Sequence, residues 1–145
     1  MHTHTFDQAL QLVAADSATP DTFLGHTSPE YWNMVGPYGG ISAAALTQAV
    51  LMHPALLGEP VALTVNYPSG LVAGPYRITA KPVRTTRSTQ HWVLTLTQTD
   101  AAGHEVVVLT ATAMTALRRN TWQANDMPMP VVPAPDATPR RALTR

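Results

Sequence analysis

The longest apolar segment of the chain lies in its first half and begins at a glycine-rich turn. Gly36 to Gly40 reads Gly-Pro-Tyr-Gly-Gly, and the apolar run that follows extends to Leu51. Its only polar side chains are Ser42, Thr47 and Gln48. A helix without a polar stripe must be buried on most sides. We therefore predict a central helix that starts at the glycine turn and ends near His53, because a residue before proline avoids the α region.

A shorter amphipathic helix is predicted at the start of the chain. Thr5 and Gln8 have the spacing of a capping box. The apolar residues of this segment follow the pattern of one buried helical face, namely Phe6, Ala9, Leu10, Val13 and Ala14. The segment from Asp16 to Asp21 should end this helix, and Thr22 to His26 could form a short strand.

Beyond Pro54 the apolar residues alternate, which is the period of strands. The predicted strands are Val61 to Tyr67, Tyr76 to Val83, Ser88 to Thr99 and Glu105 to Leu117. Pro82 indicates an edge or a bulge, and Asp100 to Gly103 is a hairpin turn. The last strand is rich in Val, Thr and Ala, so we expect it to be covered on both sides. The order of elements predicts an α+β fold, with one antiparallel sheet curled around one helix.

The chain divides into a domain and a tail. From Gln123 onward the sequence contains five prolines and shows no periodicity. Such a segment is semi-extended and packs poorly. We therefore expect one domain over residues 1–122 and a proline-rich linker or tail over residues 123–145.

Composition narrows the classes of partner. Charged residues make up 12% of the chain and the formal net charge is zero, whereas an average soluble domain is about 25% charged. Nucleic acid and anionic membrane surfaces are therefore not expected partners. A neutral chain with so little charge should cover apolar surface with a partner, which favours a homo-oligomer.

The cellular location and the need for a cofactor are inferred from features that the sequence does not contain. It has no apolar run long enough for a membrane span and no secretion signal at its start, so a cytoplasmic location is expected. It has no cysteine, and its six histidines show no metal-ligand spacing. We expect neither a metal nor a cofactor.

The glycine turn that opens the central helix resembles the hotdog-fold acyl-CoA thioesterases, in particular their TesB-like branch. The segment Leu63 to Pro68, which reads LTVNYP, and the strand from Arg84 to Leu96 carry the same resemblance. It covers roughly Phe6 to Trp122. The resemblance implies a hotdog fold and a substrate that is acyl-CoA or another acyl thioester.

The resemblance also implies an arrangement of units. Members of the TesB-like branch typically join two hotdog units in one chain through a proline-rich connection. This sequence looks like the N-terminal unit of such a protein, or like a single unit that pairs with itself. In the double form the catalytic carboxylate, hydroxyl and glutamine are usually carried by the second unit, so none of these roles is transferred to residues of this chain.

Thioester hydrolysis needs a site for the carbonyl oxygen and a group that activates water. Backbone N–H groups of Gly39, Gly40 or Ile41 could polarise the carbonyl with the help of the helix dipole. The glycines could equally serve only close helix–sheet packing. No acidic residue lies between Glu30 and Glu59, so the helix supplies no carboxylate base.

Further candidate residues flank the helix and the longest strand. Ser88 and Gln90 share a strand face with Trp92 and lie at the rim of its apolar part, where a substrate headgroup could meet an acyl tunnel. They could also be strand-end residues in contact with water. Asn33 could donate to the thioester. Arg84 and Arg87 could bind the phosphates of coenzyme A, or remain solvated. His91 falls on the opposite strand face, where histidines are mostly surface or interface residues.

Two functions stay open at this point. The first is thioester hydrolysis by a hotdog unit, which we favour. The second is a non-catalytic hotdog unit that binds acyl groups or pairs structurally with a catalytic unit, which the missing helix carboxylate supports. A hydratase on the same fold would need Asp and His close together near the central helix, and the sequence has no such pair.

Overall fold

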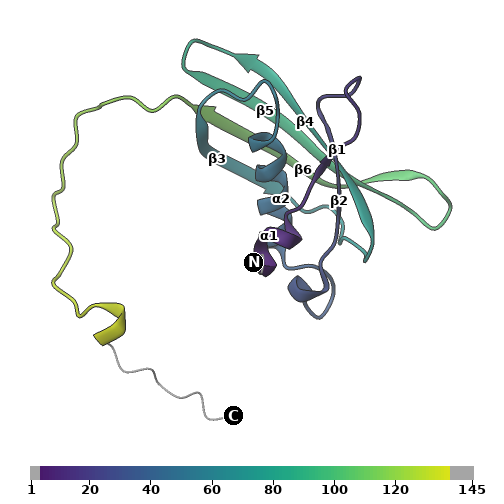
Figure 1. The fold of residues 1–145 in the computed structure, drawn as a ribbon, viewed down its shortest axis with the longest axis horizontal. Coiled ribbons are helices and arrows are strands. Elements are labelled where there is room, and N and C mark those ends of the chain that lie inside the picture. Colours follow the sequence, from purple (N-terminus) through teal and green to yellow (C-terminus); the bar gives the residue numbers. More distant parts are fainter. Residues whose placement is uncertain (1–3, 138–145) are drawn as a thin grey trace.

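One antiparallel sheet wraps around one long helix in the computed structural model, which describes residues 4–137 (Figure 1). The helices are α1 (Thr5–Ala9) and α2 (Gly39–Leu51), with 3-10 turns η1 (Pro29–Tyr31) and η2 (Pro135–Ala137). The strands are β1 (Val13–Ala14), β2 (Thr22–His26), β3 (Glu59–Asn66), β4 (Pro75–Thr85), β5 (Thr89–Thr99) and β6 (Glu105–Ala116). The predicted α+β hotdog architecture is confirmed.

The strand order of the sheet is β1-β2-β4-β5-β6-β3, and each neighbouring pair is antiparallel. The strand β3 follows α2 in the chain but pairs with the last strand, with Glu59 opposite Ala116 and Asn66 opposite Thr110. It therefore forms one edge of the sheet, and the short strand β1 forms the other. The predicted irregularity at Pro82 is confirmed, since the register of β4 against β5 shifts between Pro82 and Arg84.

The core lies between α2 and the inner face of the sheet. Trp92, Leu94 and Leu96 alternate along β5 and are at most 1% exposed. They pack in one cluster with residues of α2 that include Leu46 and Val50. Truncating one such side chain to alanine would cost about 2–5 kcal/mol of stability.

The two sides of α2 are covered to different extents. Its buried residues are Ile41, Ser42, Ala45, Leu46, Ala49 and Val50. Ala43, Ala44, Thr47 and Gln48 on the remaining surface are half-buried, and Leu51 is 44% exposed. The described residues thus bury the side of the helix that faces the sheet and cover the other side only in part.

Two predictions about individual elements are wrong. The first helix stops at Ala9, and Val13–Ala14 pairs with β2 as an edge strand, so Val13 is 67% exposed instead of buried. The predicted capping box of Thr5 and Gln8 is also wrong, because the N-cap of this helix is His4, whose Nδ1 accepts the Phe6 N–H at 3.1 Å.

The predicted cover on both faces of the last strand is not found among the described residues, since Thr112 on its outward face is exposed and Thr110 and Met114 on the same face are only half-buried. Sequence periodicity does not reveal how many layers lie against a strand.

The segment after β6 has a different character from the sheet. Residues 117–134 contain no helix or strand, and all of their side chains are exposed, including Trp122 at 89%. Within residues 4–137, no helix has the length and hydrophobicity needed to cross a membrane. The boundary between domain and tail near residue 122 stays a prediction.

Candidate functional site

A short closed loop leads into α2. Trp32 and Pro37 form an isolated β-bridge, and the Asn33 N–H donates to the Gly36 carbonyl at 2.7 Å. The Asn33 Oδ1 accepts the Met34 N–H at 2.7 Å, which fixes the side chain to its own loop. No acceptor for its Nδ2 occurs among the described residues, so the role of Asn33 as a substrate donor stays a prediction.

The first turn of α2 contains two free donors. No side chain caps the helix at Tyr38, and the Ile41 N–H donates to the Tyr38 carbonyl at 3.0 Å. The N–H groups of Gly39 and Gly40 find no acceptor within residues 4–137. Free N–H groups and the positive end of the helix dipole at the same point favour a negatively charged or strongly polarised oxygen.

Tyrosine rings cover both glycines of this turn. The Tyr67 hydroxyl donates to the Gly39 carbonyl at 2.7 Å, and a Cβ at position 39 would lie 3.4 Å from the Tyr67 ring. A Cβ at position 40 would lie 2.3 Å from Cε1 of Tyr38, so that ring would have to move. Burial, and to a smaller extent the neighbouring Tyr38, raises the pKa of Tyr67, which keeps its phenol protonated as a donor.

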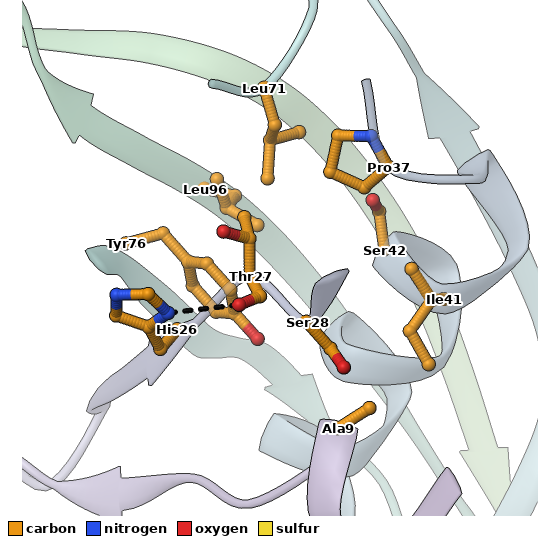
Figure 2. A pocket seen from close by; sticks show the side chains of 10 residues that line it. All are labelled: Ala9, His26, Thr27, Ser28, Pro37, Ile41, Ser42, Leu71, Tyr76 and Leu96. Carbon is orange, nitrogen blue, oxygen red and sulfur yellow. Dashed lines mark hydrogen bonds between the residues drawn. The ribbon is translucent and has the colours of Figure 1, made fainter. Parts of the chain in front are cut away.

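A small cavity adjoins the glycine turn (Figure 2). About 10 Å³ of it is open to the centre of a water molecule, which is room for about one water. Its lining consists of Ala9, His26, Thr27, Ser28, Pro37, Ile41, Ser42, Leu71, Tyr76 and Leu96. The elements that meet here are therefore α1, the end of β2, α2, the loop before β4, and the middle of the sheet.

An open groove continues from this cavity along the start of α2. The two share Pro37, Ser42 and Leu71. The other residues of the groove are Val35, Gly36, Gly39, Tyr67, Pro68, Ser69 and Gly70. Gly39 thus lies beside the groove, and Ser42 lies where groove and cavity meet.

Three polar side chains of the cavity already have partners. Thr27 Oγ1 accepts the Gly74 N–H at 2.8 Å, and Ser28 Oγ donates to Oε2 of Glu30. His26 Nδ1 lies 2.9 Å from the Thr27 carbonyl, and since a carbonyl only accepts, this nitrogen carries the proton. The His26 ring lies at the edge of the cavity, on the side opposite Ser42 (Figure 2). No carboxylate lines the cavity or the groove within the described part of the chain.

The predicted residues Ser88 and Gln90 lie at the other end of α2. Gln90 is 2% exposed, and its Nε2 donates to the Ala55 carbonyl at 2.9 Å and to Thr85 Oγ1 at 2.8 Å. Its Oε1 accepts the Leu57 N–H at 2.9 Å. Gln90 therefore holds the segment that follows α2 against the strands β4 and β5. Ser88 lies in the β4–β5 turn, where its carbonyl accepts the Leu117 N–H at 2.9 Å.

Arg84 and Arg87 belong to the same end of the sheet as Gln90. Both are exposed, Arg84 opposite His91 near the end of β4 and Arg87 in the turn that follows. The 13 residues of α2 correspond to a length of about 20 Å. The structure thus brings Asn33, Gly39 and Gly40 together at one end of the helix. It places Ser88, Gln90 and the two arginines at the other end.

His53 is a buried polar residue that the sequence did not single out. It is 5% exposed and packs edge-on against Trp92, with a ring separation of 5.0 Å. Its Nδ1 accepts the Ala55 N–H at 3.0 Å, which leaves the proton on Nε2 for Asp21 Oδ1 at 2.9 Å. Both ring nitrogens are occupied, so His53 ties the end of α2 to β2 and has no free lone pair for a base.

The cavity residues Ser42 and Tyr76 were also missed as site residues. Ser42 was visible as a polar side chain in the first turns of an otherwise apolar helix. Tyr76 gave no signal, because its position depends on how β4 crosses α2. Within residues 4–137, no group of three or more potential ligands lies close enough to hold a metal ion.

The comparisons with known proteins agree with the hotdog fold. A family model described as the acyl-CoA thioesterase N-terminal domain matches residues 28–116. A conserved protein of unknown function with a hot dog fold, from Alicyclobacillus acidocaldarius, is similar with 45% identity and a TM-score of 0.81. The match covers 95% of this chain and 49% of that one. A search of the curated proteins finds no match.

Two more distant structures share the fold. A candidate thioesterase II from Thermobifida fusca YX has 21% identity and a TM-score of 0.73, with coverage of 91% of this chain and 47% of that chain. The acyl-CoA thioesterase II TesB2 from Mycobacterium marinum has 17% identity and a TM-score of 0.67, covering 91% and 45%.

The chain spans about half the length of these three structures. The family model, in contrast, matches more than half of the chain itself and covers α2 and the strands from β3 to β6. The chain therefore belongs to the acyl-CoA thioesterase family, as a hotdog unit that corresponds to the family's N-terminal domain.

Proposed function

We propose that the chain is one unit of an acyl-CoA thioesterase and that the start of α2 binds the thioester carbonyl. The observation that carries this proposal is the pair of N–H groups of Gly39 and Gly40 without an acceptor among residues 4–137, of which Gly39 lines an open groove. During hydrolysis the carbonyl oxygen gains negative charge. Fixed donors and the helix dipole stabilise that charge without having to reorganise.

The group that activates water is proposed to come from outside this site. Among the described residues, no Asp or Glu lines the cavity or the groove. His26 keeps a lone pair on Nε2, because its Nδ1 donates to the Thr27 carbonyl, but His26 does not line the groove that contains Gly39. A general base must lie within hydrogen-bond reach of the attacking water. We therefore assign the base to a second hotdog unit, either a further unit of a longer protein or a second copy of this chain in a homo-oligomer.

The edge strand β3 is the surface that we propose for this pairing. Within the described chain, Glu59–Asn66 pairs with β6 on one side and with nothing on the other. Val61 on this strand is 59% exposed. A free edge of eight residues is a template for a further strand.

Arg84 and Arg87 are proposed ligands of the coenzyme A phosphates, with one geometric condition. They lie beyond the opposite end of α2 from Gly39, a separation of about 20 Å along the helix. A coenzyme A bound by these arginines would either span that length or belong to the carbonyl site of a neighbouring unit. We further propose that the enzyme is cytoplasmic. Its proposed site needs no bound cofactor.

The second candidate is a non-catalytic hotdog unit that binds acyl groups or supports a catalytic partner. The observation that favours it is the lack of a carboxylate among the described residues that line the cavity and the groove. In this case the Gly39 and Gly40 donors bind the carbonyl of an acyl thioester but no hydrolysis follows.

Incubation of the purified chain with acetyl-, octanoyl- and palmitoyl-CoA tests whether copies of this chain alone hydrolyse thioesters. Release of free coenzyme A, followed with a thiol reagent, is expected for an autonomous enzyme. No release above background with any of the three rejects autonomous hydrolysis. Sedimentation of the same sample tests the pairing, because a stable monomer at micromolar concentration contradicts a homo-oligomer.

A further inference from the structure

A buried glutamine lies at each end of the apolar row on the inner face of β5. Gln90 and Gln98 flank Trp92, Leu94 and Leu96, and Gln98 is 6% exposed. Burial of an amide is unfavourable unless its polar atoms have hydrogen-bond partners. Gln90 holds the segment after α2, whereas Gln98 lies at the other end of the row, where the loop before β4 meets the sheet.

The Gln98 side chain makes three hydrogen bonds to the backbone of that loop. Its Oε1 accepts the Val72 N–H at 2.9 Å, and its Nε2 donates to the Val72 carbonyl at 3.0 Å. Its Nε2 also donates to the Pro75 carbonyl at 3.2 Å. A primary amide supplies both an acceptor and two donors. Neither a carboxylate nor an aliphatic side chain of similar length can therefore replace Gln98 here.

The loop that Gln98 holds, residues 67–74 between β3 and β4, lines the groove at the start of α2. Half of the residues that line the groove belong to this loop, namely Tyr67, Pro68, Ser69, Gly70 and Leu71. The first of them, Tyr67, donates its hydroxyl proton to the Gly39 carbonyl at 2.7 Å. The conformation of the loop therefore affects both the shape of the groove and the position of Gly39.

The rest of the loop has few other anchors. Its end is held by Thr27, whose Oγ1 accepts the Gly74 N–H at 2.8 Å, and the Leu71 side chain is buried in the core. Residues 68–70 are exposed and make no hydrogen bond to the described chain. The three bonds from Gln98 therefore supply much of what holds the loop against the sheet.

We propose that Gln98 is a positioning residue of the carbonyl site, because it fixes the loop of residues 67–74 and thereby preorganises the groove beside Gly39. The inference rests on the proposed function, which places the acyl thioester in this groove. A loop that is not fixed in the free protein has to be ordered when a ligand binds, and the entropy of ordering lowers the affinity. Loss of the Gln98 bonds should therefore weaken binding in addition to lowering stability.

The test compares two variants that lose buried hydrogen bonds at different ends of the inner sheet face. Gln98→Met removes the amide with little change in side-chain length. Thr115→Val is the matched control, because Thr115 lies opposite Gln90, is fully buried and accepts the Trp92 Nε1–H at 3.2 Å. Tm should fall in both variants, so stability alone does not distinguish them.

Binding is measured by calorimetry on the full chain, well below the Tm of both variants. The ligands are amide analogues of acetyl-, octanoyl- and palmitoyl-CoA, in which NH replaces the thioester sulfur. The wild type should bind at least one of them. Its affinity should fall about fivefold in Gln98→Met, which corresponds to one net hydrogen bond, and should be unchanged in Thr115→Val.

Hydrogen exchange of the wild type tests the role of Gln98 without any variant. In the free protein, the Val72 amide should exchange about tenfold more slowly than the amides of Ser69 and Gly70, because only the Val72 amide is bonded to the sheet. Addition of the bound analogue should slow the exchange of Ser69 and Gly70.

Unchanged affinity in Gln98→Met, an equal loss in Thr115→Val, or a Val72 amide that exchanges as fast as that of Gly70 would each overturn the inference. In these cases the wild type still binds the analogue, so the proposed carbonyl site is not affected. If the wild type binds none of the three analogues, the proposed function fails and the inference fails with it.

Discussion

The polar groups at the two ends of α2 differ in whether they have hydrogen-bond partners. At the C-terminal end His53 uses both ring nitrogens, and Gln90 makes three hydrogen bonds to the segment after the helix and to Thr85. At the N-terminal end the Gly39 and Gly40 N–H groups and the Ser42 hydroxyl stay unpaired within the described chain. Unpaired polar groups lower stability, and sites that bind a ligand commonly retain them. We call the C-terminal end of α2, where these polar groups are paired, the closed end, and the N-terminal end, where they are unpaired, the open end. The closed end stabilises the fold, and the polar groups of the open end are available to bind a ligand.

The largest expected effect is on stability, when the hydrogen bonds of Gln90 at the closed end are removed. Gln90→Leu keeps the approximate size of the side chain but leaves the Ala55 carbonyl and the Leu57 N–H without their partner. Each unpaired group costs about 1–3 kcal/mol, so urea unfolding should show a loss of about 4 kcal/mol. The control is Gln11→Leu, because Gln11 is exposed and should change stability by less than about 0.5 kcal/mol.

A loss close to that of the control would mean that the closed end does not depend on Gln90. The hydrolysis rate per folded molecule is the second readout, because Gln90 was also predicted as a catalytic residue. Unchanged activity in the folded fraction would remove it from the site.

The next effect is on activity at the open end. Gly40→Val introduces a side chain where Cε1 of Tyr38 lies 2.3 Å from the Cβ position, which displaces the ring and obstructs the carbonyl site. Loss of one such donor lowers turnover by about 10²–10³-fold, and blocking the substrate carbonyl from the donors should lower acyl-CoA hydrolysis by a similar factor. Thr47→Val, two turns further along α2, is the control and should keep the rate. Full activity in Gly40→Val would show that the first turn does not bind the carbonyl.

A smaller effect is expected at Tyr67, which positions the open end. Its hydroxyl donates to the Gly39 carbonyl at 2.7 Å, and Tyr67→Phe removes only this bond. Stability should fall by about 1 kcal/mol in urea unfolding. Hydrolysis should fall several-fold through kcat, because the donors of the helix start are less well positioned. If Tyr67→Phe is as stable as the wild type, the Tyr67 hydroxyl does not help to hold Gly39 in place.

Much of the fold follows from local patterns in the sequence. The glycine turn and the proline after His53 predict both ends of α2, which the structure confirms at Gly39 and Leu51. The alternation around Trp92 predicts the buried face of β5. These features succeed because a helix end or a strand face depends on residues close in the chain.

The errors and omissions depend on residues far apart in the chain. The place of β3 beside β6 joins Glu59 to Ala116, and no local pattern contains that pairing. The spacing between Val13 and the apolar residues before it fits a helix, although Val13 belongs to the strand β1. Gln90 was predicted at the rim of a tunnel, but its bonds reach back to Ala55 across 35 residues. Ser42 and Tyr76 line one cavity only because the start of β4 lies near the start of α2.

The smallest expected effect is a pH dependence of the stability that Tyr76 contributes. It tests how far water reaches the Tyr76 phenol at the open end. Burial raises the pKa of the Tyr76 phenol, whereas a phenol in the unfolded chain ionises near pH 10. The folded protein therefore keeps the proton longer. The stability that Tyr76 contributes is fully present below about pH 10 and is lost as the pH rises further, by at most about 1.4 kcal/mol per pH unit.

Urea unfolding of the wild type and of Tyr76→Phe between pH 8 and pH 11 isolates this contribution, since every other group is common to both. The difference in the free energy of unfolding should be constant up to about pH 10 and should then shift in favour of the variant. A constant difference over the whole range would mean that water reaches the phenol freely in the folded state. The cavity would then be an open part of the groove, and the hydroxyls of Ser42 and Tyr76 would be hydrated surface groups.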